Sequence, residues 1–110
     1  MAANGKINLK RKSIVKLKWG AAGCGKFTEF GFLPALQQLK RSKLAAVYSS
    51  DLNRAKSIVT KFNASAGYNN FEEFLQHDFN SLYIGSRNSD HYSQVIQAAI
   101  AGKNILCEKP

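Results

Sequence analysis

Short apolar segments with the character of β-strands alternate along this chain with amphipathic segments that have the spacing of helices. The alternation constrains the fold, because strands separated by helices are joined by right-handed crossovers and therefore run parallel. Strands are expected at residues 15–19, 44–48, 81–86 and 104–107, with a weaker strand at 67–69. Helices are expected at residues 26–39, 52–62, about 71–75 and 90–101. We predict a single α/β domain over residues 15–110.

A parallel sheet of this length buries both faces under helices, which makes it doubly wound. We predict the strand order 3-2-1-4-5, with the switch point between the first and the fourth strand. Helical spacing predicts the residues that face the core: Phe30, Leu33, Ala35, Leu36 and Leu39; Ala55, Ile58, Val59 and Phe62; and Tyr92, Val95, Ile96 and Ala99. Ser50 or Asp51 is expected to cap the second helix.

Positive charge is concentrated at the start of the chain. The formal net charge is +9, and six of the sixteen Lys and Arg side chains lie between residues 6 and 18 with no acid among them, which leaves +3 for the rest. We interpret residues 1–14 as a basic, flexible leader that is solvated, although such a leader can also bind phosphate backbones without sequence specificity. Nothing in it resembles a secretory signal, and no apolar run has the length of a membrane span, so we predict a cytoplasmic protein with no membrane and no specific nucleic-acid partner.

The two cysteines and two histidines are not spaced as metal ligands. Cys24 and Cys107 lie far apart, and neither His77 nor His91 completes a cluster with them. We therefore predict no metal site, and two reduced thiols that act mainly as small apolar groups.

A glycine turn follows the first strand and opens the first helix. It comprises Gly23, Cys24, Gly25, Lys26 and Phe27, with Thr28 where a third glycine is usual in dinucleotide-binding turns. The first glycine permits the tight turn, and the second allows backbone N–H groups to approach a pyrophosphate at the positive end of the helix. We predict that this turn binds NAD or NADP. The alternative is a glycine turn without a ligand.

The end of the second strand bears on the choice of cofactor. An acid there would accept a hydrogen bond from the 2′-hydroxyl of NAD and would repel the 2′-phosphate of NADP. Ser49 and Ser50, with Arg54 nearby, favour NADP, whereas Asp51 would favour NAD if its carboxylate reached back. A purely capping role for Ser50 or Asp51 is compatible with both cofactors.

These motifs together resemble the Gfo/Idh/MocA family of oxidoreductases, over residues 17–110. The resemblance is carried by residues 18–25, 33–36 and 46–49, by Arg54-Ala55, by the segment from Tyr83 to His91, and above all by residues 101–110, which end in Glu108-Lys109-Pro110. It implies a Rossmann-type fold and hydride transfer between a nicotinamide cofactor and a sugar, polyol or related carbonyl. Arg87 stands where the family commonly has proline.

The resemblance also implies roles for individual residues. Ser86, Asn88 and His91 would lie along the cofactor, and Glu108 would hold the nicotinamide ribose. Lys109 would be the catalytic residue, because a lysine beside an oxidised nicotinamide has a lowered pKa that suits proton exchange with the reacting hydroxyl.

Members of this family continue after Glu-Lys-Pro into a second domain that supplies most contacts to a sugar-like substrate. We therefore expect an N-terminal fragment with little or no turnover, in which oligomers depend on the missing domain. The competing hypothesis is a non-catalytic nucleotide-binding or regulatory module, which would keep the glycine turn and have no need of Lys109.

Overall fold

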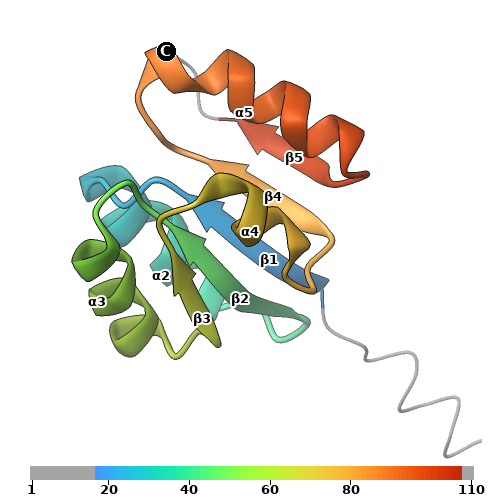
Figure 1. The fold of residues 1–110 in the computed structure, drawn as a ribbon. Helices are drawn as coiled ribbons and strands as arrows, with labels where there is room; N and C mark the ends of the chain where they lie inside the picture. Colours follow the sequence, from blue (N-terminus) through green and yellow to red (C-terminus); the bar gives the residue numbers. More distant parts are fainter. Residues whose placement is uncertain (1–16, 108–110) are drawn as a thin grey trace, which may run out of the picture.

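Five parallel strands in the order β3-β2-β1-β4-β5 form the centre of the computed structural model, which describes residues 17–107 (Figure 1). The predicted order is confirmed. The strands are β1 (Leu17–Ala22), β2 (Ser42–Tyr48), β3 (Ala66–Tyr68), β4 (Ser81–Ile84) and β5 (Asn104–Cys107). The predicted leader, residues 1–14, lies outside the described residues, as do Glu108 and Lys109.

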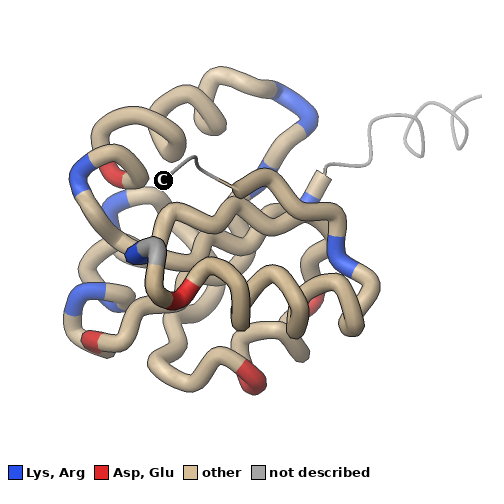
Figure 2. The backbone as a smooth tube through the Cα atoms, turned by 90° about the horizontal axis from the view of Figure 1, so that it is seen from above, with Lys and Arg blue, Asp and Glu red and all other residues tan. Residues whose placement is uncertain are grey.

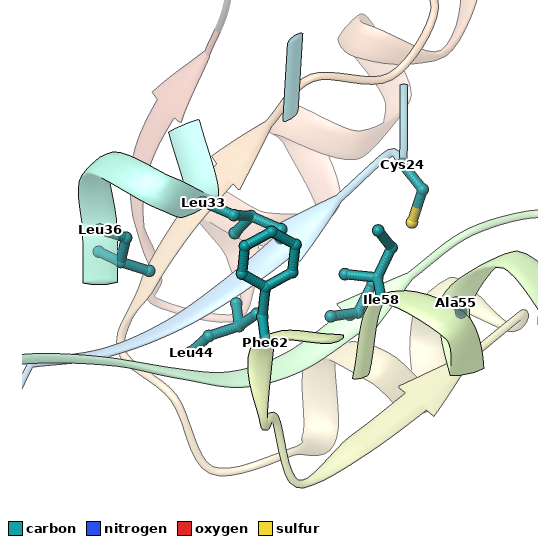
Figure 3. Packing of buried hydrophobic residues seen from close by; sticks show 9 residues of the cluster. Cys24, Leu33, Leu36, Leu44, Ala55, Ile58 and Phe62 are labelled. Atoms are coloured by element: carbon teal, nitrogen blue, oxygen red, sulfur yellow. The ribbon is translucent and has the colours of Figure 1, made fainter. Parts of the chain in front are cut away.

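Helices cover both faces of this sheet, as a doubly wound fold requires. On one face, the first helical segment, η1 (Thr28–Phe32) with α2 (Leu33–Gln37), and α3 (Leu52–Phe62) enclose one core cluster. Figure 3 shows Leu33, Leu36, Leu44, Ile58 and Phe62 of that cluster packed between these helices and β2. On the other face, α4 (Phe71–Gln76) and α5 (Asn88–Ile100) cover a second cluster, which includes Phe74, Leu82 and Ala98.

Helix α3 has the bounds and the buried face that its sequence predicts. The Asp51 carboxylate accepts hydrogen bonds from Asn53 N (3.0 Å) and Arg54 N (3.4 Å), which makes it the N-cap. Ala55, Ile58 and Phe62 are buried, and Val59 is partly buried against the same cluster. Strong capping and a consistent apolar stripe fix this helix.

The first helix departs from the predicted stripe. Leu33 and Leu36 are buried as expected, but Phe30, Ala35 and Leu39 are exposed, so the prediction was wrong for these three. Leu39 lies beyond α2, which ends at Gln37. The other two are displaced by a π-helical stretch over Thr28–Phe32, which is followed by Pro34 in the first turn of α2. Proline has no N–H to donate to the carbonyl four residues earlier, and the wider π turn rotates the faces before and after it relative to each other.

Helix α5 is also rotated from its predicted orientation. Tyr92, Ile96 and Ala99 are exposed, so their predicted inward positions were wrong, whereas Ala98 and the polar Gln94 are buried. Gln94 and His91 both hydrogen-bond to Ser86 in the loop that precedes the helix. These two bonds hold the polar side of α5 against the sheet edge, because a buried amide must keep a partner.

Figure 2 shows that the backbone positions of Lys and Arg and those of Asp and Glu are distributed around the described part of the molecule. No helix within residues 17–107 combines the length and apolar character needed to cross a membrane. The cytoplasmic location stays a prediction.

Candidate functional site at the carboxyl ends of the strands

The glycine turn lies at the carboxyl edge of the sheet, between the ends of β2 and β4. Gly23 N donates to Tyr48 O at 2.9 Å, which ties the turn to β2. Gly85 N donates to Ala22 O at 2.8 Å, which brings the loop after β4 against the end of β1. The turn is therefore held at the switch point of the sheet, where ligands of open α/β folds bind.

Gly23 is a position that requires glycine. Its φ is +100°, a left-handed conformation that side chains with a Cβ rarely adopt. A Cβ built there would lie 2.7 Å from the Gly85 carbonyl carbon and 2.7 Å from Ser86 N. Strain and backbone contact together exclude any larger residue, which agrees with the predicted tight turn.

Thr28, in the place of the third glycine, is accommodated by a glycine elsewhere. Its side chain is fully buried, and a Cβ on Gly85 would lie 2.7 Å from Thr28 Oγ1. The close approach of helix and sheet that a third glycine usually provides is thus supplied by Gly85, at the end of β4. Gly85 thus makes room for the Thr28 side chain, although the two residues are far apart in the sequence.

A cavity of about 200 Å³ opens beside this turn. Six of the predicted cofactor-binding residues line it: Gly23, Cys24, Gly25, Ser49, Ser50 and Ser86. It is also lined by five residues that the sequence analysis did not select: Tyr48, Gly85, Arg87, Asp90 and Gln94. Lys26 and Phe27 form the first helical turn beyond the glycines and are exposed. The cavity is smaller than the roughly 300 to 1,000 Å³ of most ligand pockets, so it can seat only part of a dinucleotide.

A larger hollow, of about 460 Å³, lies at the opposite edge of the sheet, where Ser42, Lys43 and Leu44 begin β2. It is lined by the last turns of α2 and α3 and has no glycine turn beside it. Because cofactors of open parallel sheets bind at the carboxyl ends of the strands, we assign the site to the smaller cavity.

Arg54 braces the glycine turn. Its Nε donates to Cys24 O at 3.1 Å, and its Nη2 donates to Glu29 Oε1, while Lys61 Nζ donates to Glu29 Oε2 at 2.8 Å. Hydrogen bonds from Lys61 and Arg54 hold the pKa of Glu29 below its usual range, and the Glu29 carboxylate raises the pKa of Arg54. The predicted phosphate ligand Arg54 is thus engaged with a carboxylate and with the turn itself. Glu29, an acid in the first turn of a helix, was not selected from the sequence.

Cys24 is a buried thiol within the turn. Its Sγ lies 3.7 Å from Tyr48 O, and burial is the main cause that raises its pKa to about 11. The thiol therefore stays protonated at neutral pH and behaves as the small apolar group that we predicted.

The end of β2 presents hydroxyl groups, and its acid is engaged. Ser49 Oγ accepts a hydrogen bond from Asp51 N at 3.1 Å, and Ser50 is exposed. The Asp51 carboxylate is turned toward the first N–H groups of α3 as its cap.

Three other predicted residues lie in the loop after β4 or at the start of α5: Ser86, Asn88 and His91. Ser86 Oγ donates to Gln94 Oε1, and His91 Nε2 donates to Ser86 O. His91 Nδ1 lies 3.7 Å from Cys107 Sγ at the end of β5. Asn88 is the first residue of α5. Glu108 and Lys109 follow β5 in the sequence, outside the described residues, so their predicted roles stay predictions.

The open space beside Gly25 can accommodate the phosphates of a dinucleotide. A Cβ built on Gly25 would meet no atom within 4 Å, and within residues 17–107 the N–H groups of Cys24 and Gly25 donate to no backbone acceptor. Exposed N–H groups at a helix start suit an anion. No group of three or more His, Cys, Asp or Glu side chains converges as a metal site in the part of the chain that the structure describes.

Comparison with known proteins places the chain in a family. Residues 17–110 match the model of the oxidoreductase family with an NAD-binding Rossmann fold named GFO_IDH_MocA. The chain belongs to the Gfo/Idh/MocA family of oxidoreductases. The resemblance described from the sequence is therefore confirmed.

Individual members of the Gfo/Idh/MocA family agree with this. The chain is 35% identical over 97 residues to trans-1,2-dihydrobenzene-1,2-diol dehydrogenase of Bos taurus, covering 86% of this chain and 29% of that protein. KijD10, a 3-ketoreductase from Actinomadura kijaniata solved with NADP and TDP-benzene, superposes with a TM-score of 0.81 and 26% identity, over 86% of this chain and 29% of the other. The WlbA dehydrogenase from Chromobacterium violaceum, solved with NADH and UDP-GlcNAcA, gives a TM-score of 0.80 and 26% identity, over 86% and 28%. The chain thus spans less than a third of each relative.

Proposed function

We propose that residues 15–110 bind the adenosine and diphosphate part of NAD(P)(H), as the cofactor domain of an oxidoreductase that acts on a sugar, polyol or related carbonyl. The observation that carries the proposal is the glycine turn at the switch point, with open space above Gly25 and two N–H groups that face no backbone acceptor among residues 17–107. A doubly negative diphosphate would accept hydrogen bonds from these groups at the positive end of the helix.

Two relatives support the choice of a nicotinamide dinucleotide, since one is solved with NADP and the other with NADH. Their substrates or ligands are named TDP-benzene and UDP-GlcNAcA, and one relative is a 3-ketoreductase. A carbonyl or alcohol on a sugar-like molecule is therefore the substrate class that we propose for the whole protein.

Of the two cofactors, we propose NADP. The Asp51 carboxylate already accepts two N–H groups of α3, so it is turned away from a 2′-hydroxyl. Ser49 and Ser50 line the cavity with hydroxyl groups, which can donate to a 2′-phosphate without repelling it.

The remaining roles are proposals on the family pattern. The nicotinamide supplies hydride chemistry when it is bound. Ser86, in the loop after β4, and Asn88 and His91, in the first turns of α5, would orient it. Glu108 would accept hydrogen bonds from its ribose, and Lys109 would hold the proton that the reacting oxygen exchanges.

The test is the substitution Gly25→Val in the 110-residue chain, with NADPH and NADH titrated by nicotinamide fluorescence. A branched side chain would fill the space that the diphosphate needs, so we expect binding to be lost. Because a Cβ at Gly25 meets no protein atom, the thermal unfolding transition should remain. Gly31→Ala is the control, since a Cβ there makes only ordinary contact with Phe27 and lies away from the cavity lining. A folded wild-type chain that binds neither cofactor, or unchanged affinity in Gly25→Val, would refute the proposal.

A further inference from the structure

Arg87 is a cation on the wall of the cofactor cavity to which no role has been assigned. It lies in the loop between β4 and α5 and lines the cavity together with the glycine turn. Among the described residues of that lining it carries the only positive charge, and Asp90 carries the only negative one. Arg54, the cation that the sequence favoured, is not part of the lining and is paired with Glu29.

The backbone places Arg87 close to the expected diphosphate. The Gly85 carbonyl carbon and Ser86 N would each lie only 2.7 Å from a Cβ built on Gly23. The loop after β4 is thus in contact with the first glycine of the turn, and Arg87 is the next residue along it. By contrast, Ser49 and Ser50, which mark the ribose side, follow β2 on the other side of β1.

The Arg87 side chain is available for a ligand. Its side chain is 85% exposed, and its ion pair with Asp90 spans 4.0 Å from Nε to Oδ2, at the outer limit for such a contact. An exposed pair of this kind contributes little to stability. A phosphate offers an arginine two parallel, charge-assisted hydrogen bonds, which are stronger than a long contact with one carboxylate oxygen.

We propose that Arg87 binds the diphosphate of the dinucleotide from the side of β4, opposite the N–H groups of the glycine turn. The inference rests on the proposed function. It gives this chain a charged ligand at a position where its family commonly has proline, a residue with neither an N–H group nor a charge. Asp90 would compete with the phosphate for the same guanidinium.

The experiment measures the dissociation constants of NADH and NADPH for the wild-type chain and for Arg87→Gln, Arg87→Lys, Asp90→Asn and Lys43→Gln, at low and at high salt. We expect Arg87→Gln to weaken both cofactors by roughly fivefold to tenfold and to reduce the salt dependence of binding. Arg87→Lys should recover part of the affinity, because it keeps the charge but not the paired geometry. Asp90→Asn should bind as tightly as the wild type or more tightly.

Lys43→Gln removes an exposed cation at the opposite edge of the sheet and controls for the net charge, so it should change neither affinity nor unfolding. Wild-type affinity in Arg87→Gln would overturn the inference and leave the proposed function intact. Weakening of NADPH alone would also overturn it, because Arg87 would then contact the 2′-phosphate, which NADH lacks. If the wild-type chain binds neither cofactor, the proposed function fails as well, so the two failures are distinguishable.

Discussion

Helices α3 and α5 are of similar length, yet they are attached to the sheet in different ways. Helix α3 buries Ala55, Ile58 and Phe62 and is capped by the side chain of Asp51. Helix α5 has no side-chain cap, and it exposes Tyr92 (79%) and Ile100 (82%) to solvent. The apolar stripe orients α3, whereas polar contacts with one loop orient α5. In α5 the polar contacts prevail over most of the predicted apolar stripe, although Val95 and Ala98 still pack against the core.

The α3 side and the α5 side also have different roles at the proposed site. On the α3 side, the charges of Glu29, Arg54 and Lys61 are paired with one another and brace the turn. On the α5 side, the side chain of Arg87 makes a long contact with Asp90, and no other ion pair of Arg87 is formed within residues 17–107. One side thus supplies a rigid support, and the other supplies a charge that can move to a ligand.

The largest expected effect is a difference in the free energy of unfolding between an Ile→Ala substitution in α3 and one in α5. Ile58→Ala should lower the free energy of unfolding by about 2 to 5 kcal/mol, because Ile58 is fully buried and its truncation leaves a cavity. Ile100→Ala should change it by less than about 0.5 kcal/mol, since Ile100 is exposed. Urea unfolding followed by circular dichroism measures both. A large loss of stability in Ile100→Ala would show that this end of α5 is covered in solution, and would remove the contrast.

The two cysteines offer a second comparison, because Cys24 is buried on the α3 side and Cys107 is exposed at the end of β5. Burial raises the pKa of Cys24 from 9.0 to about 11, which lowers its thiolate fraction near pH 8 about a hundredfold. Iodoacetamide should therefore alkylate the exposed Cys107 in the native chain well before the buried Cys24, as peptide mass spectrometry would show.

The sign of the pH effect on stability follows from the same shift. Below about pH 9 the Cys24 thiol is protonated in both the folded and the unfolded chain, so its ionisation does not change the free energy of unfolding. Between pH 9 and 11 the unfolded chain ionises this thiol while the folded chain does not, so the free energy of unfolding should fall over that range. Cys24→Ala should remove that part of the fall. Equal alkylation rates for both thiols at pH 8 would contradict the burial of Cys24.

The sequence predicted the strand order, the site of the glycine turn and the buried face of α3, because each depends on local pattern and chain connectivity. It did not predict the orientation of α5 or of the first helix. In α5, hydrogen bonds between Ser86, before the helix, and the polar residues His91 and Gln94 oppose the apolar stripe. In the first helix, Pro34 predicts an irregular start, but the π-helical stretch that shifts the buried face is not evident from apolar spacing.

The same limit applies to the site. Sequence motifs identified four residues that line one cavity: Gly23, Gly25, Ser49 and Ser86. Gly85 and Glu29 were missed, since their roles depend on Thr28 and Arg54, which approach them only in the folded chain. Arg87 carried a signal, its departure from the proline that is common in the family, but that signal has meaning only once its place on the cavity wall is known.

The smallest effect that we expect concerns the brace on the α3 side. Arg54→Gln removes the hydrogen bond to Cys24 O and one partner of Glu29, so the turn loses a constraint without losing any predicted N–H ligand. Cofactor affinity should fall by about fivefold, in keeping with the loss of one partly exposed charged hydrogen bond. Lys61→Gln is the matched control, because Lys61 also binds Glu29, and in the described part of the chain it makes no hydrogen bond with residues 23–27. Since Arg54 acts here on the turn and not on a phosphate, NADH and NADPH should weaken equally; a loss confined to NADPH would instead return Arg54 to the 2′-phosphate role that the sequence favoured.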